Sequence, residues 1–161
     1  MKFEKATLTN LNEIMKIENA GFNTAEAGSR ENYQERIQTL VDNFIVAKDE
    51  TNEVLGFICG PAVEERFIND SMYHKTPVEI DSGGHQMVLT IAISPDHRGE
   101  GIGSKLLSQF ETNAKKLNRK SIALNCLEDR IPFYEKNGFI NLGMSDSNHG
   151  DETWYNMEKV I

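Results

Sequence analysis

Two hydrophobic periodicities divide the chain into predicted strands and helices. Short apolar runs and period-two alternation indicate strands. We expect strands over residues 3–8, 44–48, 54–59, 87–93, 121–126, 139–144 and 153–157. Apolar residues spaced three and four apart indicate helices with one buried face. We expect helices over residues 11–18, 29–41, 103–117 and 131–137. Both faces of the 87–93 run are nearly apolar, which predicts a central strand that is covered on both sides.

Turn and cap residues agree with these boundaries. Ser29 can cap the helix that follows it, Pro132 suits a first helical turn, and Asn137-Gly138 is a helix stop. Residues 66–85 are polar and irregular, apart from a short helix that we expect around Met72. Such a length inside a compact domain is usual for a functional or a mobile loop.

The composition is typical of a single globular domain over residues 1–161, because 39% of the residues are apolar and 26% are charged. The net charge of -8 disfavours nucleic-acid binding, which needs a basic surface. It would favour a cationic substrate, although solubility explains it equally well. No run is long enough to span a bilayer, and no signal peptide or metal-ligand pattern is visible. We therefore expect a cytoplasmic protein with reduced cysteines and neither a membrane nor a nucleic-acid partner.

A glycine-rich loop at residues 97–104, between a predicted strand and a predicted helix, carries the candidate chemistry. Glycines let backbone N–H groups approach a ligand closely, and the first amides of a helix are unpaired at the positive end of its dipole. Such a loop can bind phosphate, and Arg98 adds a cation with a planar donor group. The spacing fails two known patterns: Ser104 stands where dinucleotide-binding loops have Gly or Ala, and Leu106 where phosphate loops have Ser or Thr.

The loop fits the motif R-x-x-G-x-G at Arg98, Gly101 and Gly103, and P-F-Y-E follows at residues 132–135. On these motifs the chain resembles the GCN5-related N-acetyltransferase (GNAT) superfamily, from about residue 3 to the end. The resemblance implies a mixed α/β fold, with a mostly antiparallel sheet of about six to seven strands, a parallel pair at the cofactor site and about four flanking helices. It also implies acetyl-coenzyme A (acetyl-CoA) as cosubstrate, and a homodimer by analogy with that architecture.

The same resemblance implies which residues hold the cosubstrate. They are Ile91, Ala92, Ile93, Arg98, Gly99, Glu100, Gly101, Ile102, Gly103, Ser104, Asn125 and Phe133. Backbone amides near residues 91–93 would polarise the thioester carbonyl. Tyr134 is the candidate general acid, because a hydroxyl with a pKa near 10 suits a departing thiolate. The alternative for Tyr134 is a ring that simply packs in the core.

The sequence leaves the general base open. An alkylammonium group must lose its proton before attack, which costs roughly 4–5 kcal/mol at neutral pH. Arylalkylamine N-acetyltransferases of the animal type use two histidines, and this chain has Met87 and Leu89 at the matching positions. His85 and His149 are the candidate bases, each with an ordinary loop histidine as the alternative.

A narrower resemblance, to the arylalkylamine (serotonin-type) N-acetyltransferases and their bacterial relatives, rests on short matches. These are Ala25-Glu26-Ala27, Glu35-Arg36, Met72-Tyr73-His74, His149-Gly150 and Thr153-Trp154-Tyr155. An aromatic acceptor site could be walled by Phe22, Tyr33, Met72, Tyr73 and Trp154, although each is more often core. Glu18 and Glu26 could bind or deprotonate an amine, but we interpret such carboxylates as solvated helix-face charges.

We therefore expect an enzyme that transfers the acetyl group of acetyl-CoA to the primary amine of a small molecule, arylalkylamine-like or polyamine-like. One alternative is a protein acetyltransferase acting on lysine or an N-terminus. Another is a non-catalytic module that binds coenzyme A. A long ordered loop over residues 66–85 that closes the site would argue against a protein acceptor.

Overall fold

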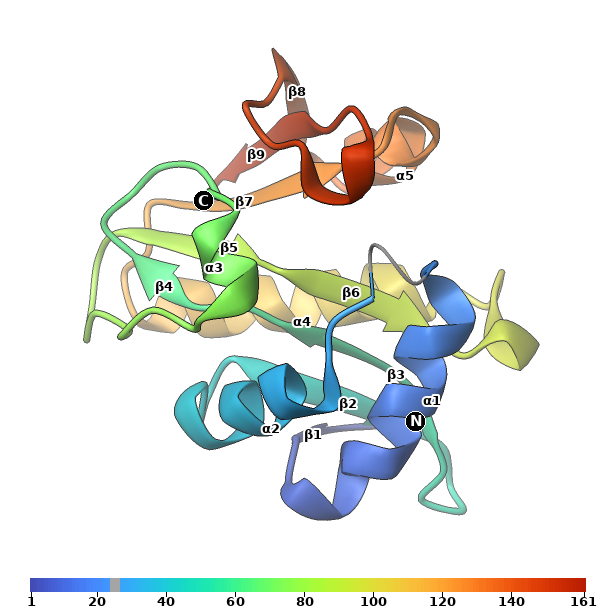
Figure 1. The fold of residues 1–161 in the computed structure, drawn as a ribbon. Coiled ribbons are helices and arrows are strands. Elements are labelled where there is room, and N and C mark those ends of the chain that lie inside the picture. Colours follow the sequence, from blue (N-terminus) through green and yellow to red (C-terminus); the bar gives the residue numbers. More distant parts are fainter. Residues whose placement is uncertain (24–26) are drawn as a thin grey trace.

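Figure 1 shows the computed structural model, which describes residues 1–23 and 27–161. The α-helices of this part are α1 (Leu11–Gly21), α2 (Arg30–Thr39), α3 (Ser71–His74), α4 (Ile102–Lys116) and α5 (Ile131–Lys136). Short 3-10 helices are η1 (Leu8–Asn10), η2 (Pro95–His97), η3 (Glu128–Arg130) and η4 (His149–Asp151). The strands are β1 (Lys2–Lys5), β2 (Phe44–Lys48), β3 (Val54–Cys59), β4 (Ala62–Val63), β5 (His85–Val88), β6 (Thr90–Ile93), β7 (Ser121–Cys126), β8 (Ile140–Met144) and β9 (Tyr155–Val160).

The strands form two sheets that are joined through the consecutive strands β5 and β6. One sheet has the order β1-β2-β3-β6, and the other has the order β4-β5-β7-β9-β8. The neighbouring strands are antiparallel, except that β5 and β7 run parallel with Met87 opposite Ala123. A parallel pair needs a crossover connection, and α4 lies in the connection here. The expected mixed fold with one parallel pair is thus confirmed.

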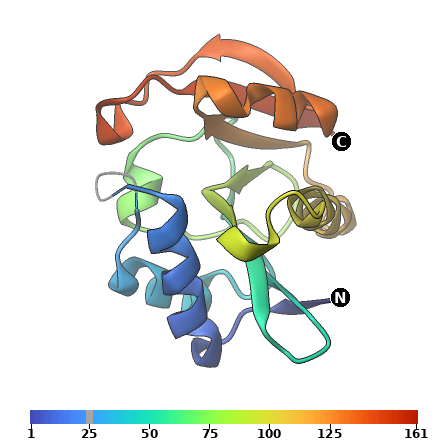
Figure 2. The same ribbon diagram turned by 90° about the vertical axis from the view of Figure 1, so that its right-hand side faces the viewer.

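Helices cover the sheets from both sides. Figures 1 and 2 show α1 and α2 on one face and α4 on the other, with α5, β8 and β9 grouped at one end. The stripe predicted on the long helix, which includes Leu106 and Phe110, is buried in the core beneath α4. A second cluster beneath α1 and α2 includes Ile14, Tyr33 and Phe57. Each such side chain contributes about 1.5–3 kcal/mol when fully buried, so the two clusters hold the helices against the sheets.

The predicted boundaries are close to the observed ones, with one important exception. The Ser29 hydroxyl caps α2 by accepting a hydrogen bond from the Asn32 amide at 3.1 Å, and the short helix expected around Met72 is α3. The prediction of one strand over 87–93 was wrong, because the chain breaks at Leu89 and its halves belong to different sheets. That break creates the candidate site.

Both cysteines lie in the core, as expected for structural thiols. Cys59 and Cys126 are free and buried, and burial raises the pKa of each thiol to about 12. A thiol with so high a pKa is inert at neutral pH. Within residues 1–23 and 27–161, no helix has both the length and the apolar character that a membrane span requires.

Candidate active site

The site begins where the chain changes partners between β5 and β6. Val88 is opposite Leu124 of β7, whereas Thr90 is opposite Cys59 of β3, and the Leu89 amide already donates to the Cys59 carbonyl at 2.8 Å. β6 is therefore the last strand of its sheet, while β7 continues along β9. One edge of β6 is left unpaired, and its backbone groups face a cleft toward β7.

The glycine-rich loop closes one end of this cleft with an uncapped helix terminus. Gly99 and Gly101 both have a φ of +81°, a conformation that residues with a Cβ seldom adopt. Gly101 is the N-cap of α4, and no side chain among the described residues caps the helix by a hydrogen bond. The first amides of α4 therefore have no intrahelical partner and lie at the positive end of the helix dipole. This arrangement fits a diphosphate.

Arg98 is held beside that helix terminus by contacts with two other elements. Its Nε donates to the Ile93 carbonyl at 3.4 Å, and its guanidinium lies against Gly21, the last residue of α1. Gly103, in the first turn of α4, approaches the ring of Phe133, because a Cβ there would lie only 3.0 Å from the ring. The cradle is thus packed between α1 and α5.

A single cleft of about 640 Å³ connects this cradle to the β6–β7 gap and continues toward α1, α2, α3 and η4. Its lining includes most of the predicted cofactor residues, namely Ile91, Ala92, Ile93, Arg98, Gly99, Gly101, Ile102, Gly103, Ser104, Asn125 and Phe133. Glu100 does not line it; its carboxylate instead lies 3.3 Å from His97 Nδ1. The cleft is large enough for an extended ligand with a second, smaller molecule at its far end.

Asn125 offers two unused hydrogen-bonding atoms to the cleft. It lies on β7 opposite Asn156, and its side-chain amide lines the gap beside β6. Both polar atoms of that amide are buried and have no hydrogen-bond partner within the described part of the chain. Buried polar groups are normally paired, so the gap suits a ligand that carries amides, as the pantetheine arm of coenzyme A does.

Tyr134 reaches the same gap from α5. Its ring packs edge-on against Phe133 and Phe139, with centroid distances of 5.0 and 5.7 Å. Burial raises the pKa of Tyr134 well above its usual value, so the hydroxyl is protonated at neutral pH and can act as a donor. Tyr134 both packs its ring in the core and lines the cleft, so the interpretation as a core residue and the interpretation as a general acid are compatible.

The far end of the cleft has an aromatic wall, and several ionisable side chains, His74 among them, line it. Phe22, Tyr73 and Trp154 form the wall, and Glu18, Arg36 and His149 line the same space. The His149 ring stacks on Tyr73 with centroids 5.1 Å apart and an interplanar angle of 16°. Trp154 Nε1 donates to the His149 carbonyl at 2.7 Å, which fixes the start of η4.

Segments far apart in the sequence are tied together above this end of the cleft. Asp70, just before α3, accepts hydrogen bonds from the Ser147 hydroxyl at 2.5 Å and the Asn148 amide at 3.3 Å. The Tyr73 carbonyl accepts from Arg36 at 3.0 Å and from Asn32 at 3.2 Å. Figure 2 shows α3 and η4 on the same side of the molecule as the end of α1. Within residues 66–85, α3 is thus held against α2 and η4, and it forms a roof over this end of the cleft.

Several sequence candidates lie elsewhere. His85 begins β5, at the opposite end of that strand from the gap, and its Nδ1 lies 2.7 Å from the Ser121 hydroxyl. It does not line the cleft, and neither do Tyr33 and Met72, which are core residues. Glu26 lies outside the described residues. His85 therefore has no position from which to serve as the base.

Our interpretation of Glu18 as a solvated charge is contradicted, because only 2% of its surface is exposed. A signal was present in the sequence. Glu18 follows Leu11, Ile14 and Met15 at the spacing of one helical stripe, and those three residues are buried. Arg36 likewise shares the buried face of α2 with Tyr33 and Ile37. A charged residue on an apolar stripe needs either a partner or a ligand.

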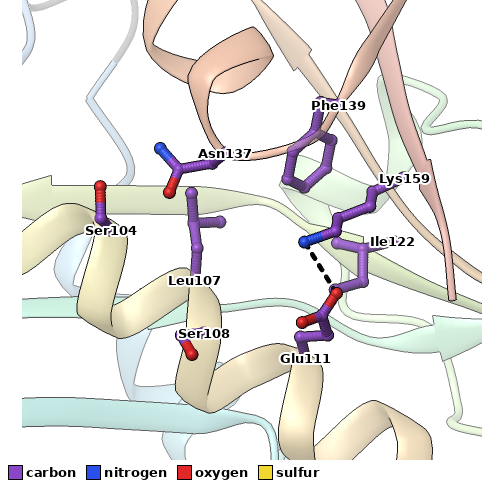
Figure 3. A pocket seen from close by; sticks show the side chains of 8 residues that line it. All are labelled: Ser104, Leu107, Ser108, Glu111, Ile122, Asn137, Phe139 and Lys159. Atoms are coloured by element: carbon purple, nitrogen blue, oxygen red, sulfur yellow. Dashed lines mark ion pairs between the residues drawn. The ribbon is translucent and has the colours of Figure 1, made fainter.

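A second hollow, of about 220 Å³, lies between α4 and the region of α5, β7 and β9 (Figure 3). Ser104 and Asn137 stand at one end of it, and the ion pair between Lys159 and Glu111, at 2.8 Å, spans the other. Its two charged residues, Glu111 and Lys159, already pair with each other.

Known protein families and solved structures that resemble this chain agree with this geometry. The sequence model of the "Acetyltransferase (GNAT) domain" family matches residues 41–141, which include the β5–β6 break, the glycine-rich loop and Tyr134. The chain therefore belongs to the GNAT acetyltransferase domain family. It is an acetyltransferase, and acetyl-CoA is its cosubstrate.

Solved structures with the same fold have names that describe different activities. Ard1 from Thermoplasma volcanium has a TM-score of 0.76 and 18% identity, over 99% of this chain and 97% of that one. The ribosomal-protein-S18-alanine N-acetyltransferase from Escherichia coli has a TM-score of 0.71 and 16% identity, over 99% and 93%. The GphF GNAT-like decarboxylase, in complex with isobutyryl-CoA, has a TM-score of 0.82 and 15% identity, over 99% of each chain. At these identities the likeness shows the fold alone.

Proposed function

We propose that this protein acetylates the primary amine of a small molecule, and that the roofed end of the cleft is the acceptor site. The observation that carries the proposal is the tie between α3 and η4, in which Asp70 holds Ser147 and Asn148 while Tyr73 stacks on His149. An acceptor peptide needs an open groove in which to lay its backbone. An ordered roof that ties three segments together suits a compact molecule instead.

The chain's own residues supply the donor side of the reaction. Amides at the start of α4 and Arg98 would hold the diphosphate, Asn125 would pair with amides of the pantetheine arm, and the open edge of β6 would polarise the thioester carbonyl. The amine nitrogen then forms a bond to the carbonyl carbon as the carbon–sulfur bond breaks. Tyr134 would donate its proton to the leaving sulfur, and its oxygen would regain a proton from the nitrogen as the neutral amide forms.

The lining favours an arylalkylamine over a polyamine within the small-molecule class. Phe22, Tyr73 and Trp154 present aromatic surface, which suits an apolar or aromatic amine body. A polyamine would instead need several carboxylates along the wall, and Glu18 is the carboxylate that the described residues place in this space. This supports the narrower resemblance to arylalkylamine N-acetyltransferases as a proposal.

A thiol-release assay with acetyl-CoA and a panel of acceptors tests the proposal. The panel contains phenethylamine and tyramine, putrescine and spermidine, and peptides with a free N-terminus or a lysine. We expect turnover with the arylalkylamines and none with the peptides. Turnover confined to peptides would contradict the small-molecule acceptor. Coenzyme A binding without turnover on any acceptor would instead support the non-catalytic alternative.

A further inference from the structure

The Glu18 carboxylate is buried in the acceptor end of the cleft with one oxygen unused. Oε2 accepts a hydrogen bond from the Gly28 amide at 2.8 Å, whereas Oε1 has no hydrogen-bond partner among the residues that the structure describes. The side chain lies on α1, which packs against β6, and it lines the cleft. A buried carboxylate oxygen without a hydrogen bond costs free energy, so this atom indicates a ligand that carries a hydrogen-bond donor.

The groups around Glu18 compensate only part of that cost. Arg36 does not pair with it, since its Nη2 donates to the Tyr73 carbonyl, its guanidinium lies 4.7 Å from the centre of the Tyr33 ring, and its Nη1 also lacks a partner among the described residues. Burial raises the pKa of Glu18, while the Gly28 amide and the electrostatic interactions with Arg36 and His149 oppose that rise. A carboxylate in this setting is a better base than one in water.

A short chain of contacts connects Glu18 to the point where the thioester would react. Tyr33 lies beside Gly28, the residue that holds Glu18 Oε2, and its hydroxyl donates to Thr90 Oγ1 at 3.2 Å. Thr90 is the first residue of β6, directly after the break that opens the gap. Glu18 is therefore one side chain away from the strand edge that would polarise the carbonyl.

We infer that Glu18 receives the acceptor as its ammonium ion and takes a proton from it, directly or through one water, before the amine attacks. This rests on the proposed function and deepens it by assigning the base. One proton moves from nitrogen to Glu18 Oε1, and the neutral nitrogen attacks the carbonyl carbon. As the carbon–sulfur bond breaks, the sulfur takes the Tyr134 proton, and the nitrogen gives its second proton back to the Tyr134 oxygen to leave the neutral amide. The His149 ring, stacked on Tyr73 and tilted by 51° relative to Trp154, forms part of the wall.

The test compares the pH dependence of kcat/KM for the wild type, Glu18→Gln and Glu31→Gln, whose glutamate is exposed on α2, with an arylalkylamine as acceptor. With Glu18 as base, the wild-type profile rises at low pH and levels off. Glu18→Gln should lose about 10²-fold at neutral pH. Its profile should then climb with a slope of one toward the pKa of the free amine, because only the neutral amine reacts. Glu31→Gln should follow the wild type.

A second variant and a binding measurement keep the result interpretable. His149→Gln should still show a limb that rises at low pH, and Glu18→Gln should bind coenzyme A with unchanged affinity. If Glu18→Gln stays within threefold of the wild type with the same profile, or if His149→Gln removes the limb, the assignment is wrong. No wild-type turnover with any amine would contradict the proposed function itself, which separates the two failures.

Discussion

The role of Tyr134 as general acid, predicted from the sequence, can be tested by one substitution. Replacing it with Phe keeps the ring that packs on Phe133 and Phe139 and removes only the hydroxyl. We expect kcat to fall by about 10²-fold, because the thiolate then leaves without an acid. Tyr155→Phe, on β9 and outside the cleft lining, is the matched control and should keep normal turnover in the thiol-release assay. Normal turnover of Tyr134→Phe with an unchanged pH profile would remove Tyr134 from the mechanism.

Glu18 should also leave a signature in stability that does not depend on activity. Its folded pKa is raised by burial, so its contribution to stability is fully present below its unfolded pKa of about 4.3 and is lost as the pH rises through the raised value. Glu18→Gln cannot ionise. We therefore expect it to melt at a higher temperature than the wild type at pH 7.

Thermal unfolding of both proteins between pH 4 and pH 8 measures this difference. The gain of Glu18→Gln over the wild type should shrink as the pH falls and vanish near pH 4. A variant that melts below the wild type at pH 7, or a difference that does not change with pH, would show that the buried carboxylate carries no ionisation cost.

At the scale of elements, a pair of glycine variants can distinguish a loss of diphosphate binding at the start of α4 from a loss of stability caused by backbone strain. Gly101 and Gly143 both have positive φ, +81° and +99°, and a Cβ at either would have no atom of residues 1–23 or 27–161 within 4 Å. An alanine at either position should therefore cost about 1–2 kcal/mol of stability. Only Gly101→Ala places its methyl group where the diphosphate would lie. We expect at least a tenfold loss of coenzyme A affinity for that variant alone in calorimetry, and equal losses in both would contradict the cradle.

The roof is a second element-scale feature with its own test. Asp70→Ala removes the acceptor of two hydrogen bonds from residues 147 and 148, and Asp146→Ala changes an exposed carboxylate of the same loop. Hydrogen bonds to a charged group contribute about 1.5–3 kcal/mol, so Asp70→Ala should raise the KM of the amine about tenfold or more. Coenzyme A affinity should stay the same in both variants. A normal amine KM in Asp70→Ala would show that the roof does not shape the acceptor site.

For the molecule as a whole, local sequence patterns predicted which segments form strands better than they predicted which strands pair with each other. The runs 44–48, 54–59 and 121–126 coincide with β2, β3 and β7, because buried strands and their turns leave a local signature. The break at Leu89 has no such signature. Alternation shows that residues 87–93 are extended, but not that Val88 pairs with β7 while Thr90 pairs with β3. The gap, and hence the site, depends on that long-range pairing.

The candidate site was predictable to the extent that its parts are contiguous in sequence. The loop 98–104 and Tyr134 form short motifs, and the structure brings them to one cleft. The acceptor end is built from α1, α2, α3 and η4, which meet only in the folded protein. From the sequence, His85 and His149 are equally good candidates for the general base. Only the fold distinguishes them, because His85 begins β5 whereas His149 stacks on Tyr73.

The proposed cosubstrate site can be tested directly by titrating the isotope-labelled protein with coenzyme A and following its backbone amide resonances. If the start of α4 and the open edge of β6 hold the cosubstrate, the largest saturable shifts should fall on the amides of residues 99–104 and 91–93, with the Asn125 side-chain amide shifting along with them. Shifts that cluster on another surface, or no saturable shift in those residues, would contradict the site and the chemistry built on it.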